Sequence, residues 1–262
     1  VGSQGRLPGA VSGLDQSQPV SYQVSAFYAL APLDEALIEE VLLGLQSWQG
    51  GEPQLNGMVL VAPDGVNATL AGSRATVESI EAWLSERMPL STVKRSHSPV
   101  APFRRWKVVR RRETVTSGVV GKSAQAAPHL SPQEWHQMMQ REGVLLIDVR
   151  NDYEIRLGTF RGAVDPGTSN FSQFADYVAN LSVPKDQPIL TFCTGGIRCE
   201  KAAPYLKAQG YSQVYQLEGG ILNYIEHYPG GLFEGECFVF DDRVSLDQNL
   251  QPTTLYRRCP EC

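Results

Sequence analysis

One segment constrains the fold more than any other: an apolar run, a glycine-containing loop and a helix start follow one another directly. The apolar run is 188–192, the loop is 193–199, and a helical pattern opens at Glu200. Such a run predicts a buried strand, and the helix after it predicts a parallel sheet covered on both faces. Ligands of these sheets bind outside the carboxyl ends of the strands, where this loop would lie.

The loop has the composition of a reactive-thiol site. It consists of Cys193, Thr194, Gly195, Gly196, Ile197, Arg198 and Cys199. Loop amides that converge on the centre, and the N-terminus of the following helix, stabilise a thiolate over a thiol. Arg198 adds a permanent cation at the rim. We therefore expect Cys193 to be a catalytic nucleophile rather than a small packed side chain.

The sequence leaves two roles open for Cys199. In one, its thiol resolves a persulfide or sulfenate on Cys193 by forming a disulfide. In the other, Cys199 is a small residue packed in the first turn of the helix, since a short loop often cannot reach disulfide geometry.

A second apolar run, residues 144–147, ends in charged residues. Asp148 and Arg150 follow it at once, and Glu154 and Arg156 come soon after. These residues form either an ion-pair shell around the cysteine loop or an ordinary solvated cluster. Because Asp148 follows a buried run, we expect it to pair with an arginine, as structural support rather than as a catalytic acid.

The patterning divides the chain into five parts. Residues 1–19, rich in Gly, Ser and Gln, predict a segment without fixed structure. Residues 20–116 follow the order strand–helix–strand–strand–helix–strand, which predicts a ferredoxin-like sandwich. Residues 117–129 form the linker, 130–230 the domain with the parallel sheet, and 231–262 a short tail that contains cysteines.

Six cations gather near the end of the first domain. They are Arg104, Arg105, Lys107, Arg110, Arg111 and Arg112. One interpretation is a solvated strand edge protected against aggregation. The other, which we favour, is contact with RNA phosphates, since the chain as a whole carries a net charge of −5. Strand alternation would turn Trp106 and Val108 to the core and leave Arg105 and Lys107 as the contacts.

The cysteine count bears on location and on metal binding. Five cysteines without a disulfide-scaffold spacing fit a reducing cytoplasm, and we see neither a signal segment nor a membrane span. Cys259 and Cys262 have the spacing of half a zinc site, which this chain alone does not complete. The four histidines have no metal-ligand spacing, and we see no flavin or nicotinamide fingerprint.

The cysteine loop resembles the active-site loop of rhodanese domains, with the nucleophile first and an arginine five positions on. Longer stretches narrow the resemblance, namely 63–72, 103–107, 113–116, 193–202 and 237–241. Over residues 20–262 the chain resembles the bacterial tRNA uridine hydroxylases, which place a ferredoxin-like domain before a rhodanese-like one. The resemblance implies 5-hydroxylation of the wobble uridine in the tRNA anticodon loop, with dioxygen as co-substrate and Cys193 required.

Two other functions stay open at this point. The loop suits a sulfurtransferase that carries a persulfide on Cys193 equally well. A tRNA-binding module without catalysis, in which the loop is vestigial, is the third hypothesis. A reactive Cys193 would argue against the third.

Overall fold

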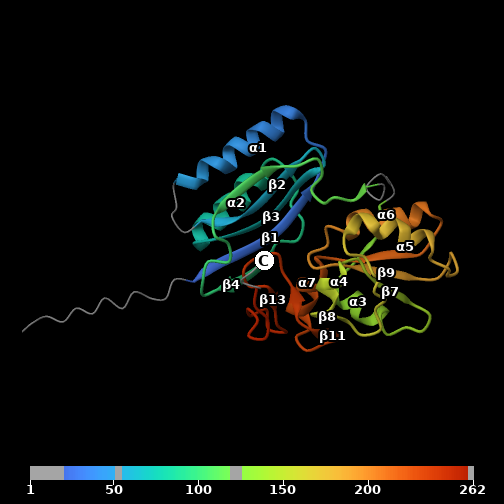
Figure 1. Ribbon diagram of the computed structural model, residues 1–262. Helices are drawn as coiled ribbons and strands as arrows, with labels where there is room; N and C mark the ends of the chain where they lie inside the picture. Colours follow the sequence, from blue (N-terminus) through green and yellow to red (C-terminus); the bar gives the residue numbers. More distant parts are fainter. Residues whose placement is uncertain (1–20, 51–54, 119–125, 259–262) are drawn as a thin grey trace, which may run out of the picture.

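The structure is a computed structural model that describes residues 21–50, 55–118 and 126–258. The predicted N-terminal segment 1–19 lies outside these residues, and so do Cys259 and Cys262. Most of the predicted linker, 119–125, also lies outside them. Figure 1 shows two domains side by side, with the C-terminal segment between them.

The N-terminal domain is a five-stranded sheet with helices on one face. Its elements are β1 (Tyr22–Leu30), α1 (Glu35–Ser47), η1 (Trp48–Gly50), β2 (Asn56–Ala62), β3 (Gly65–Gly72), α2 (Arg74–Ser85), β4 (Lys94–Ser98) and β5 (Trp106–Arg110). The strand order is β4-β1-β3-β2-β5. The first four strands have the ferredoxin-like order, so that prediction is confirmed. The basic strand β5 is an addition that lies parallel to β2 at the far edge.

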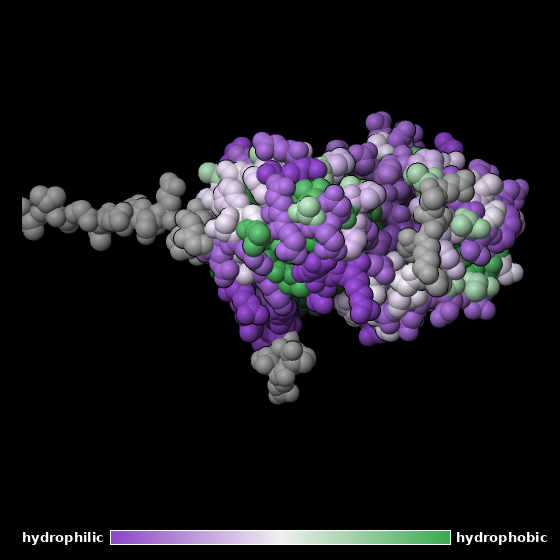
Figure 2. Space-filling model, turned by 90° about the horizontal axis from the view of Figure 1, so that it is seen from above, coloured by the Kyte–Doolittle hydropathy of each residue, from purple (hydrophilic) through white to green (hydrophobic). Residues whose placement is uncertain are grey.

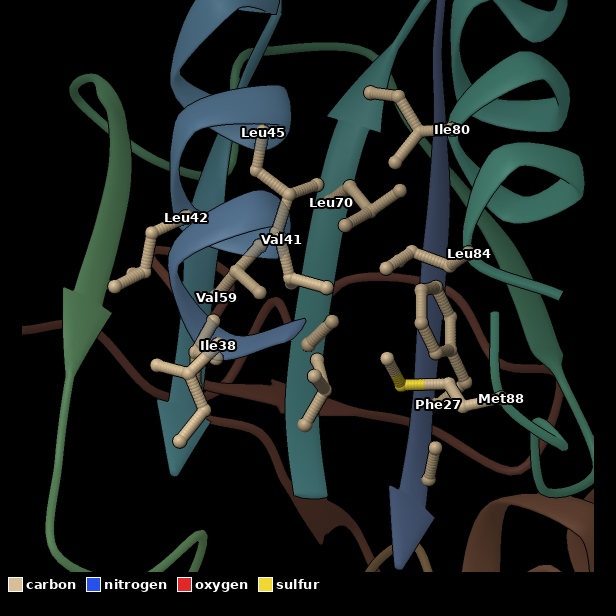
Figure 3. Packing of buried hydrophobic residues seen from close by; sticks show 14 of the residues in the cluster. Phe27, Ile38, Val41, Leu42, Leu45, Val59, Leu70, Ile80, Leu84 and Met88 are labelled. Carbon is tan, nitrogen blue, oxygen red and sulfur yellow. The ribbon is translucent and has the colours of Figure 1, made fainter. Parts of the chain in front are cut away.

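The core of this domain lies between the sheet and its two helices. Asp34 and Ser73 cap the N-termini of α1 and α2, as their side-chain oxygens accept backbone N–H groups. Figure 3 shows apolar side chains of both helices packed on the sheet, among them Ile38, Leu45 and Ile80. Because strand residues alternate, residues such as Met58 and Thr69 lie on the opposite face of the sheet, away from the two helices.

The second domain is a parallel sheet between two layers of helices. Its elements are β6 (His129–Leu130), α3 (Pro132–Met138), β7 (Leu145–Asp148), α4 (Asp152–Ile155), β8 (Gly158–Phe160), η3 (Phe171–Gln173), α5 (Phe174–Ala179), β9 (Ile189–Phe192), α6 (Cys199–Ala208), β10 (Val214–Leu217) and α7 (Gly220–His227). The sheet order is β6-β10-β9-β7, all parallel. Helices α5 and α6 share one core cluster, and α3 and α7 share the other. The predicted parallel sheet with both faces covered is confirmed.

The tail is folded against both domains. It contains β11 (Phe233–Gly235), β12 (Cys237–Phe238) and β13 (Ser245–Leu246). β11 pairs with β8, while β12 and β13 form a short antiparallel pair that we call the C-terminal hairpin, residues 237–246. Two hydrogen bonds join the hairpin to the N-terminal domain, from Asp242 N to Pro102 O at 2.7 Å and from Arg243 Nη1 to Ser96 Oγ at 2.7 Å.

The surface is mostly hydrophilic. Figure 2, viewed from the α1 side, shows polar residues over most of the face with small hydrophobic areas between them. Within the described ranges, every helix is too short or too polar to cross a membrane.

Candidate active site

Cys193 lies at the carboxyl end of β9, directly before the loop that leads into α6. Its side chain is only 1% exposed. The backbone N–H of Gly196 points back at the sulfur, with N and Sγ 3.2 Å apart. The sequence predicted a loop whose amides converge on this cysteine, and the contact with Gly196 is of that kind.

The amides can face the sulfur because the loop carbonyls are bound on the outside. At the start of α7, the N–H of Ile221 donates to the carbonyl of Cys193 at 3.0 Å. The N–H of Leu222 donates to the carbonyl of Thr194 at 3.2 Å. Because these two carbonyl oxygens accept hydrogen bonds from α7, they point away from the thiol. Their partial negative charges therefore do not oppose a thiolate.

Gly220 makes this contact with α7 possible. Its φ is +70°, a left-handed conformation that side chains rarely adopt. A Cβ at this position would lie 2.5 Å from the carbonyl oxygen of Cys193 and 2.6 Å from that of Thr194. Only glycine therefore lets the helix start so close to the loop.

The electrostatic surroundings favour the thiolate. Burial by itself raises the pKa of Cys193. A hydrogen bond from the Cys199 thiol, the charge of Arg198 and the backbone N–H groups of both residues outweigh burial and lower this pKa to about 5. Cys193 is therefore a thiolate at neutral pH, which is the reactive form of cysteine.

Cys199 lies in the first turn of α6 as a free, fully buried thiol. Burial, the hydrogen bond to Cys193 and the neighbouring negative charge raise its pKa well above the ordinary value. It therefore stays protonated and donates to the thiolate. This donor role is additional to the two that the sequence left open, and its part in any disulfide stays a prediction.

Arg198 is held by Glu154 in a buried, two-bonded ion pair. The guanidinium donates to the two carboxylate oxygens at 2.6 and 2.8 Å. The charges of Glu154 and Cys193 raise the pKa of Arg198 against the effect of its burial. The pair fixes the cation near the sulfur. Arg156 does not join it, because that side chain is exposed and pairs with Asp152.

Asp148 and Arg150 form a second buried pair beside the loop. Arg150 Nε and Nη2 donate to the two oxygens of Asp148 at 2.9 and 2.6 Å. Thr159 Oγ1 also donates to this carboxylate, and Arg150 reaches the carbonyl of Gly158. The expected pairing of Asp148 with an arginine is confirmed. Both residues are fully buried, which suits structural support.

The N-terminal domain contributes two side chains to the loop that sequence reasoning missed. Lys94 Nζ donates to the carbonyl of Gly195 at 2.9 Å, and Tyr28 Oη donates to Glu200 Oε1 at 2.7 Å. Burial lowers the pKa of Lys94 to about 8, although the charge of Cys193 raises it. Nothing in the polar stretch around Lys94 marks it as a residue that would be buried.

Glu200 is the centre of a hydrogen-bond network between the domains. His129 Nε2 lies 2.8 Å from Glu200 Oε1, and Gln216 Nε2 donates to Oε2 at 3.1 Å. Burial raises the pKa of Glu200, but the bonds from His129 and Tyr28 outweigh it and lower the pKa. An ionised carboxylate therefore holds β1, β6 and β10 against the first turn of α6.

A second contact between the domains is made by the next residue of α6, Lys201. Lys201 Nζ is 2.9 Å from Asp64 Oδ2 and 3.2 Å from Glu113 Oε2, and it donates to the carbonyl of Val115 at 3.0 Å. These bonds fix the end of the basic segment against the helix that follows the cysteine loop.

The hairpin encloses the loop from another side. Thr194 Oγ1 donates to the carbonyl of Phe238 at 3.4 Å. Cys237, also fully buried, lies beside Thr194, and burial raises its pKa to about 12. Cys237 is the first residue of the stretch 237–241, which carries part of the family resemblance.

The basic segment lies at the edge of the sheet away from the loop. Trp106 is buried and Val108 packs against the core, so the predicted core-facing pair is confirmed. Arg104, Arg105, Arg111 and Arg112 are exposed, and Lys107 is half-buried. Arg110 is engaged by Glu35 and Glu39 of α1. The structure therefore does not bring these six residues to Cys193: β5 is four strand spacings from β4, or about 19 Å.

Among the described parts of the chain, no three side chains of His, Cys, Asp or Glu gather as a metal site. The predicted half zinc site, Cys259 and Cys262, lies outside them.

Comparison with known proteins covers both domains. Residues 22–114 match the family described as UPF0176 acylphosphatase like domain, and residues 131–227 match the rhodanese-like domain. The acylphosphatase-like description agrees with the ferredoxin-like strand order found here.

Several curated relatives carry the name tRNA uridine(34) hydroxylase. One from Bdellovibrio bacteriovorus is 44% identical over 255 residues, covering 94% of this chain and 71% of the relative. One from Synechocystis is 42% identical over 252 residues, covering 93% and 88%. A third, from Legionella pneumophila, is 43% identical over 247 residues, covering 91% and 94%. The resemblance seen in the sequence is thereby confirmed, and the chain belongs to the tRNA uridine(34) hydroxylase family.

Proposed function

We propose that this protein hydroxylates uridine 34 of tRNA at C5 of the base, with Cys193 as the catalytic thiolate and dioxygen as co-substrate. The observation that carries the proposal is the lowered pKa of Cys193, together with a chain that matches the named hydroxylases over almost its whole length. A packed structural cysteine needs no donors around its sulfur, whereas a nucleophile does.

A thiolate has a specific use on a pyrimidine ring. Addition of the Cys193 sulfur to C6 would open the C5=C6 double bond and make C5 a carbon nucleophile. C5 then takes an oxygen atom, and loss of the C5 proton and of the thiolate restores the double bond. One atom of dioxygen enters the base. The other leaves as water, with two protons and with two electrons from a reductant other than this chain.

The open face of the N-terminal sheet offers a route for RNA to this loop. Residues paired across the sheet share one face, and two such rows cross it from β5 to the cysteine loop. One row is Lys107, Met58, Thr69, Ala26 and Lys94, and the next is Val109, Leu60, Asn67 and Tyr28. The residues in the middle of the two rows are partly exposed. Lys94 and Tyr28, which end the rows at the cysteine loop, are buried. We infer that the anticodon loop lies along these rows.

The proposal assigns different roles to the cations of the basic segment. Lys107 stands at the start of the first row and Arg105 lies two residues before it, and both side chains are assigned to RNA phosphates, as the sequence led us to expect. Arg110 points to the helix side, where Glu35 and Glu39 already neutralise it. Arg110 therefore serves as a matched control for the other two.

The direct test is mass spectrometry of digested tRNA. Cells that lack the protein should lose nucleosides derived from 5-hydroxyuridine, and a wild-type copy should restore them. A Cys193→Ser copy should fail, because serine is far less acidic than this cysteine. Full restoration by Cys193→Ser would contradict the catalytic assignment.

RNA contact is tested separately, by salt titration of binding to an anticodon stem-loop. Replacing Arg105 and Lys107 by alanine should weaken binding and make log affinity against log salt shallower by about 0.7 for each lost contact. Arg110→Ala should change the slope much less. An unchanged slope in the folded double variant would show that β5 is not the RNA surface.

A sulfurtransferase remains the second candidate, because a thiolate cradled by loop amides also suits a persulfide. A thiosulfate-to-cyanide assay with the purified protein separates the two. Turnover at ordinary enzyme rates, about 1 per second or faster, would favour sulfur transfer. A binding module without catalysis would instead show an unreactive Cys193 thiol at neutral pH.

A further inference from the structure

A large apolar side chain stands exposed at the rim of the cysteine loop. Phe240, at the tip of the C-terminal hairpin, is 59% exposed. Its ring centroid lies 5.8 Å from the guanidinium carbon of Arg198. Phe238 meets Phe240 edge-on with centroids 5.1 Å apart, and Tyr153 meets Phe238 at 5.4 Å. Three aromatic rings and one cation thus form a continuous group beside Cys193.

The hairpin tip that presents Phe240 is tightly fixed. The carboxylate of Asp241 accepts the backbone N–H of Arg243 at 3.0 Å and two guanidinium N–H groups at 2.8 and 2.6 Å. Val244 follows with a φ of 66°, a left-handed conformation that is strained for a β-branched residue. Such strain persists only where the surroundings enforce it. The backbone that carries Phe240 is therefore held in one place, while most of the Phe240 side chain stays exposed.

The same hairpin is attached to the reactive loop and to the N-terminal domain. The bond from Thr194 to the carbonyl of Phe238 places the aromatic group one residue from Cys193. The bonds from Asp242 to Pro102 and from Arg243 to Ser96 connect it to the domain with the open sheet. The hairpin that carries Phe240 therefore contacts both the cysteine loop and the domain that the proposed RNA route crosses.

We propose that Phe240, supported by Phe238 and Tyr153, is a stacking surface for one base of the anticodon loop while uridine 34 is held at Cys193. This inference rests on the proposed function. Single-stranded RNA is commonly bound by stacking its unpaired bases on aromatic rings, and an arginine beside the ring adds attraction for the phosphates.

The test combines variants of the protein with variants of the RNA. Phe240→Ala and Phe240→Leu remove the ring, Phe240→Trp keeps it, and Leu43→Ala on α1 is a control at another exposed apolar residue (65% exposed). Each is titrated with a labelled anticodon stem-loop, and with stem-loops in which uridine 34 or one neighbour is replaced by an abasic nucleotide. Alkylation of Cys193 checks that the loop is intact.

We expect Phe240→Ala and Phe240→Leu to weaken binding by about 5- to 100-fold. Phe240→Trp and Leu43→Ala should stay close to wild type. With one of the abasic RNAs, Phe240→Ala and the wild-type protein should bind equally well. The nucleotide replaced in that RNA is then the stacked base. The inference fails if Phe240→Ala binds within twofold of wild type, or if its loss persists with every abasic RNA, as an apolar protein partner at this ring would predict.

Hydroxylation measured on the same samples separates this inference from the proposed function. If the wild-type protein binds the stem-loop and shows the dependence on Phe240 but never hydroxylates it, the function is wrong and the stacking surface stands. If the wild-type protein hydroxylates and Phe240→Leu has unchanged kcat/KM and affinity, the function stands and the stacking surface is wrong.

Discussion

The cysteine loop and the C-terminal hairpin each bury a cysteine, and both cysteines neighbour Thr194, Cys193 along the chain and Cys237 through its thiol. Cys193 and Cys237 are equally hidden from solvent, at 1% and 0% exposed. Their pKa values nevertheless move in opposite directions, to about 5 and about 12. Burial opposes the thiolate at both, so burial cannot be the cause of the difference.

The two pKa values differ because hydrogen-bond donors point at the sulfur of Cys193. Cys193 receives the N–H of Gly196, the Cys199 thiol and the field of Arg198, while the loop carbonyls are bound elsewhere. At Cys237 the charge of Arg150 lowers the pKa, but Glu154 and Asp148 oppose it and burial prevails. The comparison shows that donor orientation, rather than depth, decides which buried cysteine can react.

The largest expected difference between the two regions is in alkylation. At pH 7 Cys193 is almost entirely thiolate, whereas Cys237 is almost entirely thiol. Even allowing for the weaker nucleophilicity of an acidic thiol, iodoacetamide should modify Cys193 about 30- to 150-fold faster. Peptide mass mapping over a time course measures both rates in one sample. Equal rates would contradict the opposite pKa shifts of the two thiols.

The pH dependence of the same experiment has a defined sign. Because the folded-state pKa of Cys193 is lowered from 9.0 to about 5, its reactivity should fall as the pH drops through about 5. The unfolded chain holds the proton up to about pH 9. Stability contributed by this group therefore rises with pH between about 5 and 9 and is lost below 5. A reactivity midpoint near 9 would contradict the assigned environment.

The next prediction compares the buried ion pair beside the cysteine loop with the one in the C-terminal hairpin. Glu154→Gln would remove the carboxylate that pairs with buried Arg198, and Asp241→Asn would do the same to Arg243 in the hairpin. Each should lower the free energy of unfolding by about 3–5 kcal/mol, measured by denaturant titration. Glu234→Gln, which breaks an exposed pair, should cost about 0–1 kcal/mol. The hairpin variant, unlike the loop variant, should leave the titration of Cys193 unchanged.

The smallest effect should come from the Cys199 thiol. Cys199→Ala removes one donor to Cys193 and keeps the other donors, so the pKa of Cys193 should rise by up to about one unit. Thiolate absorbance against pH measures the shift. Cys199→Ser keeps a donor and should fall between alanine and wild type. An unshifted titration in Cys199→Ala would mean that the backbone and Arg198 suffice.

Local patterns were enough to predict both sheets and the place of the cysteine loop. An apolar run followed by glycines and a helix can form little else than a strand end in a parallel sheet. The burial of Asp148 and its arginine partner followed from the same logic, because a charge after a buried strand needs a counter-charge. The inward orientation of Trp106 and Val108 followed from strand alternation.

The contacts that complete the site could not be predicted in this way. Lys94 meets Gly195 from about a hundred residues away, and Tyr28 meets Glu200 from further still. Such pairings depend on how two separately folded sheets meet, which no local periodicity encodes. The basic segment shows the same limit, since its composition was visible but its place at the far edge of the sheet was not.

The bond from Thr194 to Phe238 has a consequence for biosynthesis. The hairpin is synthesised after the rest of the site, and domains generally fold from the N-terminus during translation. The cysteine loop should therefore spend on the order of seconds without its hairpin as each new chain leaves the ribosome. During that interval the acidic thiol has one neighbour fewer, so nascent chains should be more sensitive to oxidants than the finished protein.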